Sequence, residues 1–434
     1  MDKKFKIIFI INFLSLLFLA KPVLSESNFQ SKFTPQELKN APVKIIPYPQ
    51  NIIWKRKTTN INELKLIGSE KLSDSNIEEL HEIASSYNIR IKGQAPISIS
   101  FEIDASIQKE GYYLSISGNI ITIKAAEQAG FFYAFQTIRQ LLNRSTSGTN
   151  IHNCIIEDYP AYPVRGFMLD VGRNFQSLAS LKRQLDIMAR YKLNLFHWHL
   201  TDKPAWRIES KIYPQLTDSA NHRPTRDPGE YYSYDEIREL IKYARKKHIQ
   251  ILPEIDMPGH SDSFTEAMGV RMESNKGMQY LENILEEFFQ EIPSQDCPQI
   301  HLGSDEVHIP NPDEFISRMV NICERNDRGV VIWNPGLNAN SNVIRQTWQA
   351  KHIKKSNFKE IDSWNSYINN GEPMTQILKL FFKPIGYQSE NEIIGGILCL
   401  WLDVNIDEEK DAFLFNPHIP SLLTYAWKTW TADV

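Results

Sequence analysis

Two adjacent carboxylates, Asp305 and Glu306, follow a short apolar run at residues 300–303. Hydrolysis of a glycosidic bond needs a carboxylic acid that protonates the leaving oxygen and a second group that stabilises the oxocarbenium-like transition state. Neighbouring side chains at the end of a strand point in different directions, so this pair could fill both roles on one ligand. Because Asp-Glu pairs are also common on solvated surfaces, their meaning depends on the elements that position them.

Short apolar runs alternate with amphipathic helical segments from residue 164 onward. The runs lie at 164–171, 193–199, 249–255, 299–303, 329–333 and 395–401, with fainter ones near 343–346 and 360–363. This alternation predicts a parallel sheet with crossover helices. Eight strands in roughly 270 residues suit a closed (β/α)8 TIM barrel, a fold that needs about 250. An open doubly wound sheet is the alternative, but no glycine-rich phosphate loop follows any of the runs.

Polar and aromatic side chains cluster at the carboxyl ends of these runs. They are Asp170 and Arg173; His197, His199 and Asp202; Glu254, Asp256 and His260; Asp305, Glu306 and His308; Trp333; and Trp401 and Asp403. The carboxyl ends of barrel strands form one rim, where active sites lie. We therefore expect these residues to converge. Arg165 lies inside the first run, where a buried guanidinium needs a partner, either a structural carboxylate or sugar hydroxyls.

The residues before this region predict a smaller α+β domain. Residues 112–124 read as two strands around the turn at Gly118-Asn119, and Phe131, Phe135 and Ile138 recur at helical spacing. The proline-containing segment 158–163 interrupts regular structure. We expect an α+β domain over residues 26–160 and the catalytic barrel over residues 161–434.

The first 25 residues predict a secretory signal peptide. Three lysines precede an apolar run at 7–20, and cleavage is expected after Ser25. The run is short for a membrane span, which needs about 20 apolar residues, so we expect secretion or a periplasmic location and no stable span after cleavage. The net charge of −4 gives no reason to expect nucleic acid as a partner. The four widely spaced cysteines show no metal-binding pattern.

Several stretches resemble glycoside hydrolase family 20, the β-N-acetylhexosaminidases. They are RGFMLDVGRNF (165–175), NLFHWHLTDKPAWR (194–207), ILPEIDMPGH (251–260) and HLGSDEVH (301–308), and they occur in the family's order and spacing. The N-terminal IIPYPQNI (45–52) and the segment AGFFYAFQTIRQLL (129–142) also match. The resemblance covers nearly all of the chain after the leader.

This resemblance implies removal of terminal N-acetylhexosamines by substrate-assisted catalysis, with neither metal nor cofactor. The substrate's acetamido oxygen would attack the anomeric carbon and give an oxazolinium ion, with Glu306 as acid and then base and Asp305 orienting the acetamido N–H. The remaining matches imply substrate-binding roles: Tyr367 on the acetamido oxygen; Trp333, Trp348 and Trp401 around the acetamido group; Arg165 on sugar hydroxyls; and Asp202, Asp256 and His260 beneath the acid.

Two positions depart from the family pattern. Asn369 and Asp403 stand where the family often has Asp and Glu, which contact the distal hydroxyls, so the gluco or galacto preference stays open. Two other functions are also open. His197 and His199 form an HxH motif that could bind a metal with His260 and Asp305, and a site altered at residues 369 and 403 could bind glycans without hydrolysing them.

Overall fold

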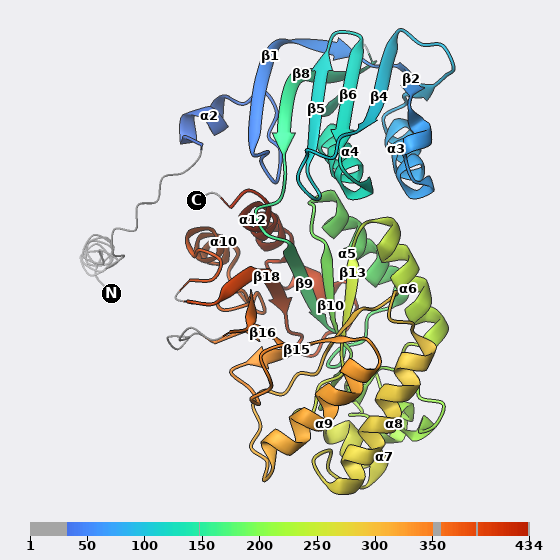
Figure 1. Cartoon of the computed structure of the whole chain (residues 1–434), viewed down its shortest axis with the longest axis vertical. Coiled ribbons are helices and arrows are strands. Elements are labelled where there is room, and N and C mark those ends of the chain that lie inside the picture. Colours follow the sequence, from blue (N-terminus) through green and yellow to red (C-terminus); the bar gives the residue numbers. More distant parts are fainter. Residues whose placement is uncertain (1–32, 147, 350–356, 388, 433–434) are drawn as a thin grey trace, which may run out of the picture.

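The computed structural model describes residues 33–146, 148–349, 357–387 and 389–432, so the expected signal peptide lies outside the described residues. An N-terminal sheet with two long helices lies against one end of a parallel barrel (Figure 1). None of the described helices is long and apolar enough to cross a bilayer.

The N-terminal sheet mixes parallel and antiparallel pairs. Its strand order is β1 (Asn51–Asn60), β8 (Gly148–Asp158), β5 (Tyr112–Ser117), β6 (Ile120–Ala125), β4 (Ile97–Ile103), β2 (Glu63–Ile67) and β3 (Arg90–Ile91), and β7 (Leu142–Ser145) pairs with β8. The two strands expected over residues 112–124 are β5 and β6, antiparallel around Gly118. The α+β character predicted for this region is thereby confirmed.

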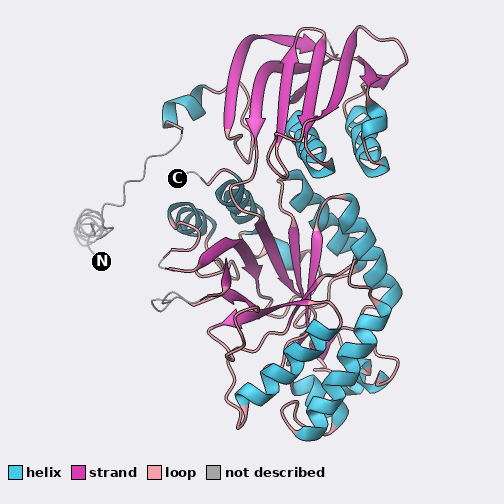
Figure 2. Ribbon diagram, in the orientation of Figure 1, coloured by secondary structure: helices cyan, strands magenta, loops and turns pink. Residues whose placement is uncertain are grey.

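Helices α3 (Asp74–Ser86) and α4 (Gln128–Leu141) cover the face of this sheet that is turned toward the barrel (Figure 2). The expected apolar face of α4 is buried: Phe131 and Phe135 are fully enclosed and make edge contacts with Phe101 of β4. A short helix, α2 (Pro35–Asn40), precedes the sheet and begins with a complete capping box at Thr34.

The barrel closes through eight parallel strands, as predicted. They are β9 (Val164–Asp170), β10 (Leu195–His199), β13 (Gln250–Glu254), β14 (Gln299–His301), β15 (Gly329–Asn334), β16 (Ile344–Thr347), β17 (Lys359–Asp362) and β18 (Glu392–Leu400), with β18 pairing back to β9. Each strand overlaps an apolar run of the sequence. The open doubly wound alternative is therefore wrong.

Most strand connections carry the helices of a (β/α)8 barrel. The helices are α5 (Leu178–Arg190), α6 (Tyr234–Lys246), α8 (Asn275–Glu291), α9 (Pro312–Arg325), α10 (Pro373–Phe382) and α12 (His418–Trp430). The loops carry the short helices α7 (Asp262–Met268) and α11 (Asp411–Leu414), a ribbon of β11 (Thr201–Asp202) and β12 (Ala205–Trp206), and the 3-10 turns η2 (Pro214–Thr217) and η3 (Ser219–Asn221). A further 3-10 turn, η1 (Ser69–Lys71), lies in the N-terminal domain. Between β15 and β16, residues 335–343 form no helix. A loop alone therefore joins these two adjacent parallel strands.

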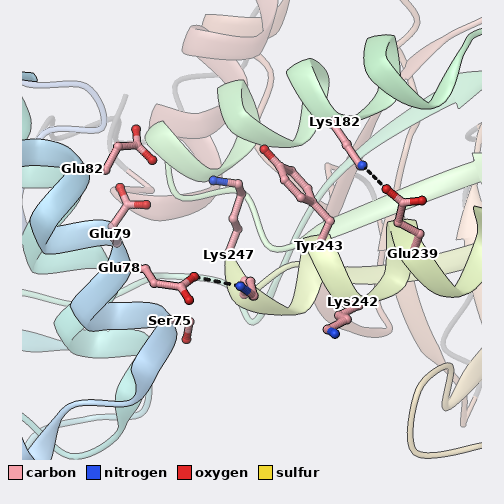
Figure 3. Close-up of a pocket in the computed structure, with 10 residues that line it drawn as sticks. Ser75, Glu78, Glu79, Glu82, Lys182, Glu239, Lys242, Tyr243 and Lys247 are labelled. Atoms are coloured by element: carbon pink, nitrogen blue, oxygen red, sulfur yellow. Dashed lines mark hydrogen bonds and ion pairs between the residues drawn. The ribbon is translucent and has the colours of Figure 1, made fainter.

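The junction between sheet and barrel is polar and tightly bonded. Asp158, at the end of β8, accepts hydrogen bonds from Lys192 Nζ at 2.8 Å, Tyr112 Oη at 2.7 Å and Trp430 Nε1 at 2.8 Å, and all of these side chains are buried. Figure 3 shows a pocket at the same junction, where glutamates of α3 face lysines of α6 and Lys246 pairs with Glu78 at 2.8 Å. None of the strand-end residues lines this pocket.

Candidate active site

The expected convergence of strand-end residues is seen at the barrel rim. Register places His199 of β10 level with Asp170 of β9 and with Glu254 of β13, and Glu254 level with His301 of β14. The carboxyl ends of these strands thus bring side chains that are 55 to 79 residues apart in sequence into direct hydrogen bonds with Glu254. One connected polar cluster results.

Asp305 and Glu306 lie on a sharply turned loop that follows β14. Gly303, Ser304 and Glu306 all have positive φ, at 61°, 80° and 51°. A Cβ atom on Gly303 would lie 1.7 Å from Asp256 Oδ1, so only glycine fits there. Positive φ at Ser304 and Glu306 is a strained conformation of the kind found at functional sites. The turn gives the two carboxylates different surroundings.

Asp305 is a buried carboxylate with an unsatisfied oxygen. Its exposed fraction is 9%, and Oδ1 has no hydrogen-bond partner among the described residues. Burial, together with the charges of Asp256, Glu254 and Glu306, raises the pKa of Asp305 to about 8 against the opposing effect of His260. Because buried acceptors are nearly always bonded, Asp305 is suited to receive an N–H group or a developing positive charge from a ligand.

Glu306 is the accessible member of the pair, with 58% of its side chain exposed. Its Oε2 lies 3.2 Å from His260 Nε2, and His260 Nδ1 lies 2.7 Å from Asp256 Oδ2. Burial lowers the pKa of His260, but the hydrogen bond to Asp256 and the nearby carboxylates outweigh it and bring that pKa to about 9. Asp256 and His260 therefore hold Glu306 through a charged hydrogen bond.

Aromatic side chains lie beside the pair. Trp333, at the end of β15, is buried and donates from Nε1 to Glu254 Oε1 at 2.7 Å. Its ring centre lies 5.7 Å from that of Trp401, which in turn lies 5.9 Å from that of Tyr367. Trp348 packs at the edge of the same cluster and donates to the carbonyl of Pro335 at 3.0 Å. Burial keeps the pKa of Tyr367 well above its ordinary value, so its hydroxyl stays a donor.

Arg173 organises the opposite side of the rim. It lies 2.8 Å from Asp170, 3.0 Å from Asp202 and 3.7 Å from Asp403. Asp403 also accepts a hydrogen bond from Asn369 Nδ2 at 2.9 Å. The two positions that depart from the family pattern therefore contact each other, and Asp403 also contacts Arg173, in a partly exposed cluster that could meet ligand hydroxyls.

The substrate-binding role expected for Arg165 is wrong. Arg165 lies near the start of β9, at the barrel end facing the N-terminal domain, and is fully buried. Its guanidinium pairs with Glu110 at 2.9 Å and bonds Tyr133 Oη at 3.1 Å. It is the structural ion pair that the sequence left open. Arg173, which the sequence placed at the correct strand end, is the arginine at the site.

The HxH motif is committed to hydrogen bonds within the protein. His197 Nε2 and His199 Nδ1 lie 2.7 Å and 2.6 Å from the same oxygen, Glu254 Oε2. His301 Nδ1 accepts a bond from the amide of Gly303 at 3.0 Å. These contacts account for the close approach of imidazoles and carboxylates, which form three groups whose spacing also suits a metal ion. The hydrogen bonds to Glu254 explain the geometry of His197 and His199 without a metal ion.

A closed parallel barrel with an Asp-Glu pair, a His-Asp support and enclosing indole rings at its carboxyl rim has the architecture of a glycoside hydrolase. Two family models specify which: glycosyl hydrolase family 20, domain 2, matches residues 43–159, and glycosyl hydrolase family 20, catalytic domain, matches residues 162–276. The chain belongs to glycosyl hydrolase family 20. The second match ends before Asp305, so the assignment of the carboxylate pair depends on its motif and geometry.

Relatives and solved structures agree with this family. A β-hexosaminidase of Porphyromonas gingivalis is 33% identical over 244 residues, which is 50% of this chain and 31% of that protein. The β-N-acetylhexosaminidase of Bacteroides fragilis has a TM-score of 0.73 at 25% identity, covering 89% of this chain and 90% of that one. A mutant Streptomyces plicatus β-hexosaminidase in complex with GlcNAc has a TM-score of 0.76 at 22% identity, with 89% and 90% covered. The matches span only about a third of the length of the first curated relatives.

Proposed function

We propose that the protein is an exo-acting β-N-acetylhexosaminidase that removes terminal, non-reducing β-linked GlcNAc or GalNAc from glycans. The observation that carries this proposal is the buried, unpartnered oxygen of Asp305 beside the accessible, His260-bonded carboxyl of Glu306. A two-carboxylate mechanism with a protein nucleophile would need Asp305 to reach the anomeric carbon. A buried oxygen that lacks a donor suits an acetamido N–H better.

Catalysis would proceed in two steps with retention of configuration. In the first, the acetamido oxygen of the substrate attacks the anomeric carbon while Glu306 protonates the leaving oxygen. Asp305 accepts the acetamido N–H, aligns the group and balances the positive charge of the oxazolinium ion. In the second, Glu306 takes a proton from water while the water oxygen attacks the anomeric carbon and breaks its bond to the acetamido oxygen, which opens the oxazolinium ring and restores the acetamido group. His260 and Asp256 hold the carboxyl of Glu306 through both proton transfers.

The remaining side chains would position the sugar. Trp333, Trp348 and Trp401 would enclose the acetamido methyl, and the Tyr367 hydroxyl would donate to the acetamido oxygen. At the other end, Arg173 takes the hydroxyl-binding role first expected of Arg165, together with the bonded pair Asn369 and Asp403. Parallel assays with GlcNAc and GalNAc glycosides measure which sugar Asn369 and Asp403 favour.

We also propose that the N-terminal leader exports the enzyme to the periplasm or the medium, where free glycans would be its substrates. Three lysines, the apolar run at 7–20 and the site after Ser25 support this. Mass spectrometry of the exported protein should give a mature chain that begins at Glu26. A mature chain that retains the apolar run would contradict the proposal.

The function is tested with nitrophenyl N-acetyl-β-glucosaminide and galactosaminide and with N,N'-diacetylchitobiose. Because a poor leaving group needs protonation, Glu306→Gln should lower kcat on the disaccharide by about 10²–10⁴-fold, with a smaller effect on the nitrophenyl substrates. Glu314→Gln makes the same change at an exposed position of α9 and serves as the control. Unchanged turnover of the disaccharide by Glu306→Gln would refute the assignment, and binding of the sugars without any hydrolysis would favour the glycan-binding alternative.

A further inference from the structure

Glu254 is a fully buried carboxylate directly beneath the candidate site, at the last position of β13. Its two oxygens contact different side chains. Oε1 accepts the indole N–H of Trp333 at 2.7 Å. Oε2 meets His197 Nε2 at 2.7 Å and His199 Nδ1 at 2.6 Å. A buried carboxylate is tolerated only when both of its oxygens have hydrogen-bond partners, as here, because transfer of an unpaired charge out of water costs several kcal/mol.

These contacts keep Glu254 ionised although it has no access to water. Burial raises the pKa of Glu254, but the surrounding histidines outweigh it and hold that pKa well below the ordinary value. His199 is the matching cation: burial lowers its pKa, yet the charge of Glu254 and the bonds to Asp202 and Glu254 raise it well above the ordinary value. The indole of Trp333 is thus bonded to a fixed negative charge, which is a stronger anchor than a neutral acceptor.

The same carboxylate is connected to the opposite side of the pocket. His199 Nε2 lies 3.0 Å from Asp202 Oδ2, and that oxygen lies 3.0 Å from Arg173 Nη2. Arg173 is the residue that faces Asp403. An unbroken series of hydrogen bonds therefore runs from the indole of Trp333 through Glu254 and His199 to Asp202, and an ion pair joins Asp202 to the guanidinium of Arg173.

We propose that Glu254 is a positioning residue that fixes Trp333, on the acetamido side of the pocket, relative to Arg173, on the hydroxyl side. This inference rests on the proposed function, since it assigns the acetamido group to the Trp333 side. It adds a role to a residue that does not itself meet the sugar. The expected consequence is a narrow acetamido pocket whose width depends on the Glu254–Trp333 hydrogen bond.

Acyl-chain discrimination measures that width directly. The observable is the ratio of kcat/KM for the nitrophenyl N-acetyl glucosaminide to that for the N-butyryl analogue. In Glu254→Gln the indole can bond only to a neutral amide oxygen, a weakening that corresponds to about 10-fold, so the ratio should fall by about 10-fold. A lower fraction of folded enzyme scales both substrates equally and leaves the ratio unchanged.

Two further variants isolate the contact. Trp333→Phe also lowers the ratio, and the double variant with Glu254→Gln should lose no more than the larger single loss, because both remove one shared bond. Asp158→Asn is the matched control. Asp158 is also a buried carboxylate that accepts a tryptophan indole N–H, at 2.8 Å from Trp430, but it lies at the domain junction. It should lower the melting temperature and leave the ratio at the wild-type value.

A readout independent of turnover separates this inference from the proposed function. In protein labelled with ¹⁵N-tryptophan, the indole N–H resonance of Trp333 is assigned by its absence from Trp333→Phe. That resonance should exchange slowly in the wild type and shift and exchange faster in Glu254→Gln. If this variant does not fold, Glu254→Asp, which withdraws the charge by one methylene, replaces it in both measurements.

The outcomes are distinct. A wild-type enzyme without hexosaminidase activity overturns the proposed function, while the indole resonance still reports on the anchor. An active enzyme in which the folded Glu254 variants keep the wild-type acyl ratio and the wild-type Trp333 resonance overturns the positioning role. Additive losses in the double variant would also overturn it, because they would show that Glu254 and Trp333 act separately.

Discussion

Replacing Asp305 by asparagine should abolish most of the activity without destabilising the fold. The substitution keeps the size of the side chain and removes its charge. If the oxazolinium charge forms about 4 Å away, the Coulomb energy is about 4 kcal/mol at the effective dielectric constant of roughly 20 that suits protein sites, and about 1 kcal/mol in water. Because Asp305 is only 9% exposed, the larger figure applies.

This energy corresponds to a loss of about 10³-fold in kcat, since each 1.36 kcal/mol is tenfold. The assay is steady-state hydrolysis of a nitrophenyl N-acetyl-β-glucosaminide, for which leaving-group protonation contributes little. Thermal unfolding supplies the control. An ionised carboxylate whose pKa is raised by burial destabilises the folded state, so Asp305→Asn should melt no lower than the wild type, and higher at alkaline pH.

The pH profile gives a second test of the same residue. Only the ionised form of Asp305 can balance the positive charge of the oxazolinium ion, and burial raises its pKa. The kcat/KM of the wild type should therefore fall as the pH is lowered, along a limb displaced above the ordinary carboxyl range, and Asp305→Asn should lose this limb. A variant that keeps activity within about fivefold of the wild type, the water limit, or that retains the limb, would refute the reasoning.

Three further predictions concern residues around the site. Arg165→Met should lower the stability by about 3–5 kcal/mol, because it leaves Glu110 without its buried partner, and the folded fraction should keep the wild-type KM; a raised KM would restore a sugar-binding role. Arg173→Lys should raise KM by at least about 10-fold, because a single ammonium group cannot contact several carboxylates as the guanidinium does. The KM is measured with N-acetylglucosamine glycosides, and an unchanged KM would remove Arg173 from the site. Exhaustive chelation should leave turnover intact, since His197 and His199 are bonded to Glu254; activity that is lost on chelation and restored by a divalent metal would revive the metal-dependent alternative.

The fold was predictable because most of the barrel strands are nearly continuous apolar runs. Buried parallel strands need such runs, and the predicted run at 329–333 differs from β15 by one residue. β16 and β17 gave fainter signals because their residues, IRQT and KEID, are largely polar. The absence of a helix between β15 and β16 could not be predicted from the sequence, since a segment as long as residues 335–343 can form either a short helix or a loop.

The rim residues were predictable from position, but their contacts were not. The sequence placed both Arg165 and Arg173 on the first barrel strand or its end. Which one faces the sugar depends on which end of the strand each occupies, and Glu110, the partner of Arg165, lies in the other domain. The role of Glu254 was hidden for the same reason: its partners Trp333 and His199 come from two other strands.

The junction at Asp158 has a consequence for how the chain reaches its native state. Gln50, near the first strand, donates to the carbonyl of Trp430, and Trp430 donates to Asp158, so segments near both ends of the described chain meet beneath the barrel. The N-terminal sheet cannot complete its contacts until the last helix has left the ribosome. A barrel produced alone from residue 161 would expose Lys192 without its counter-charge. Such a fragment should aggregate, and the two domains should unfold in one transition.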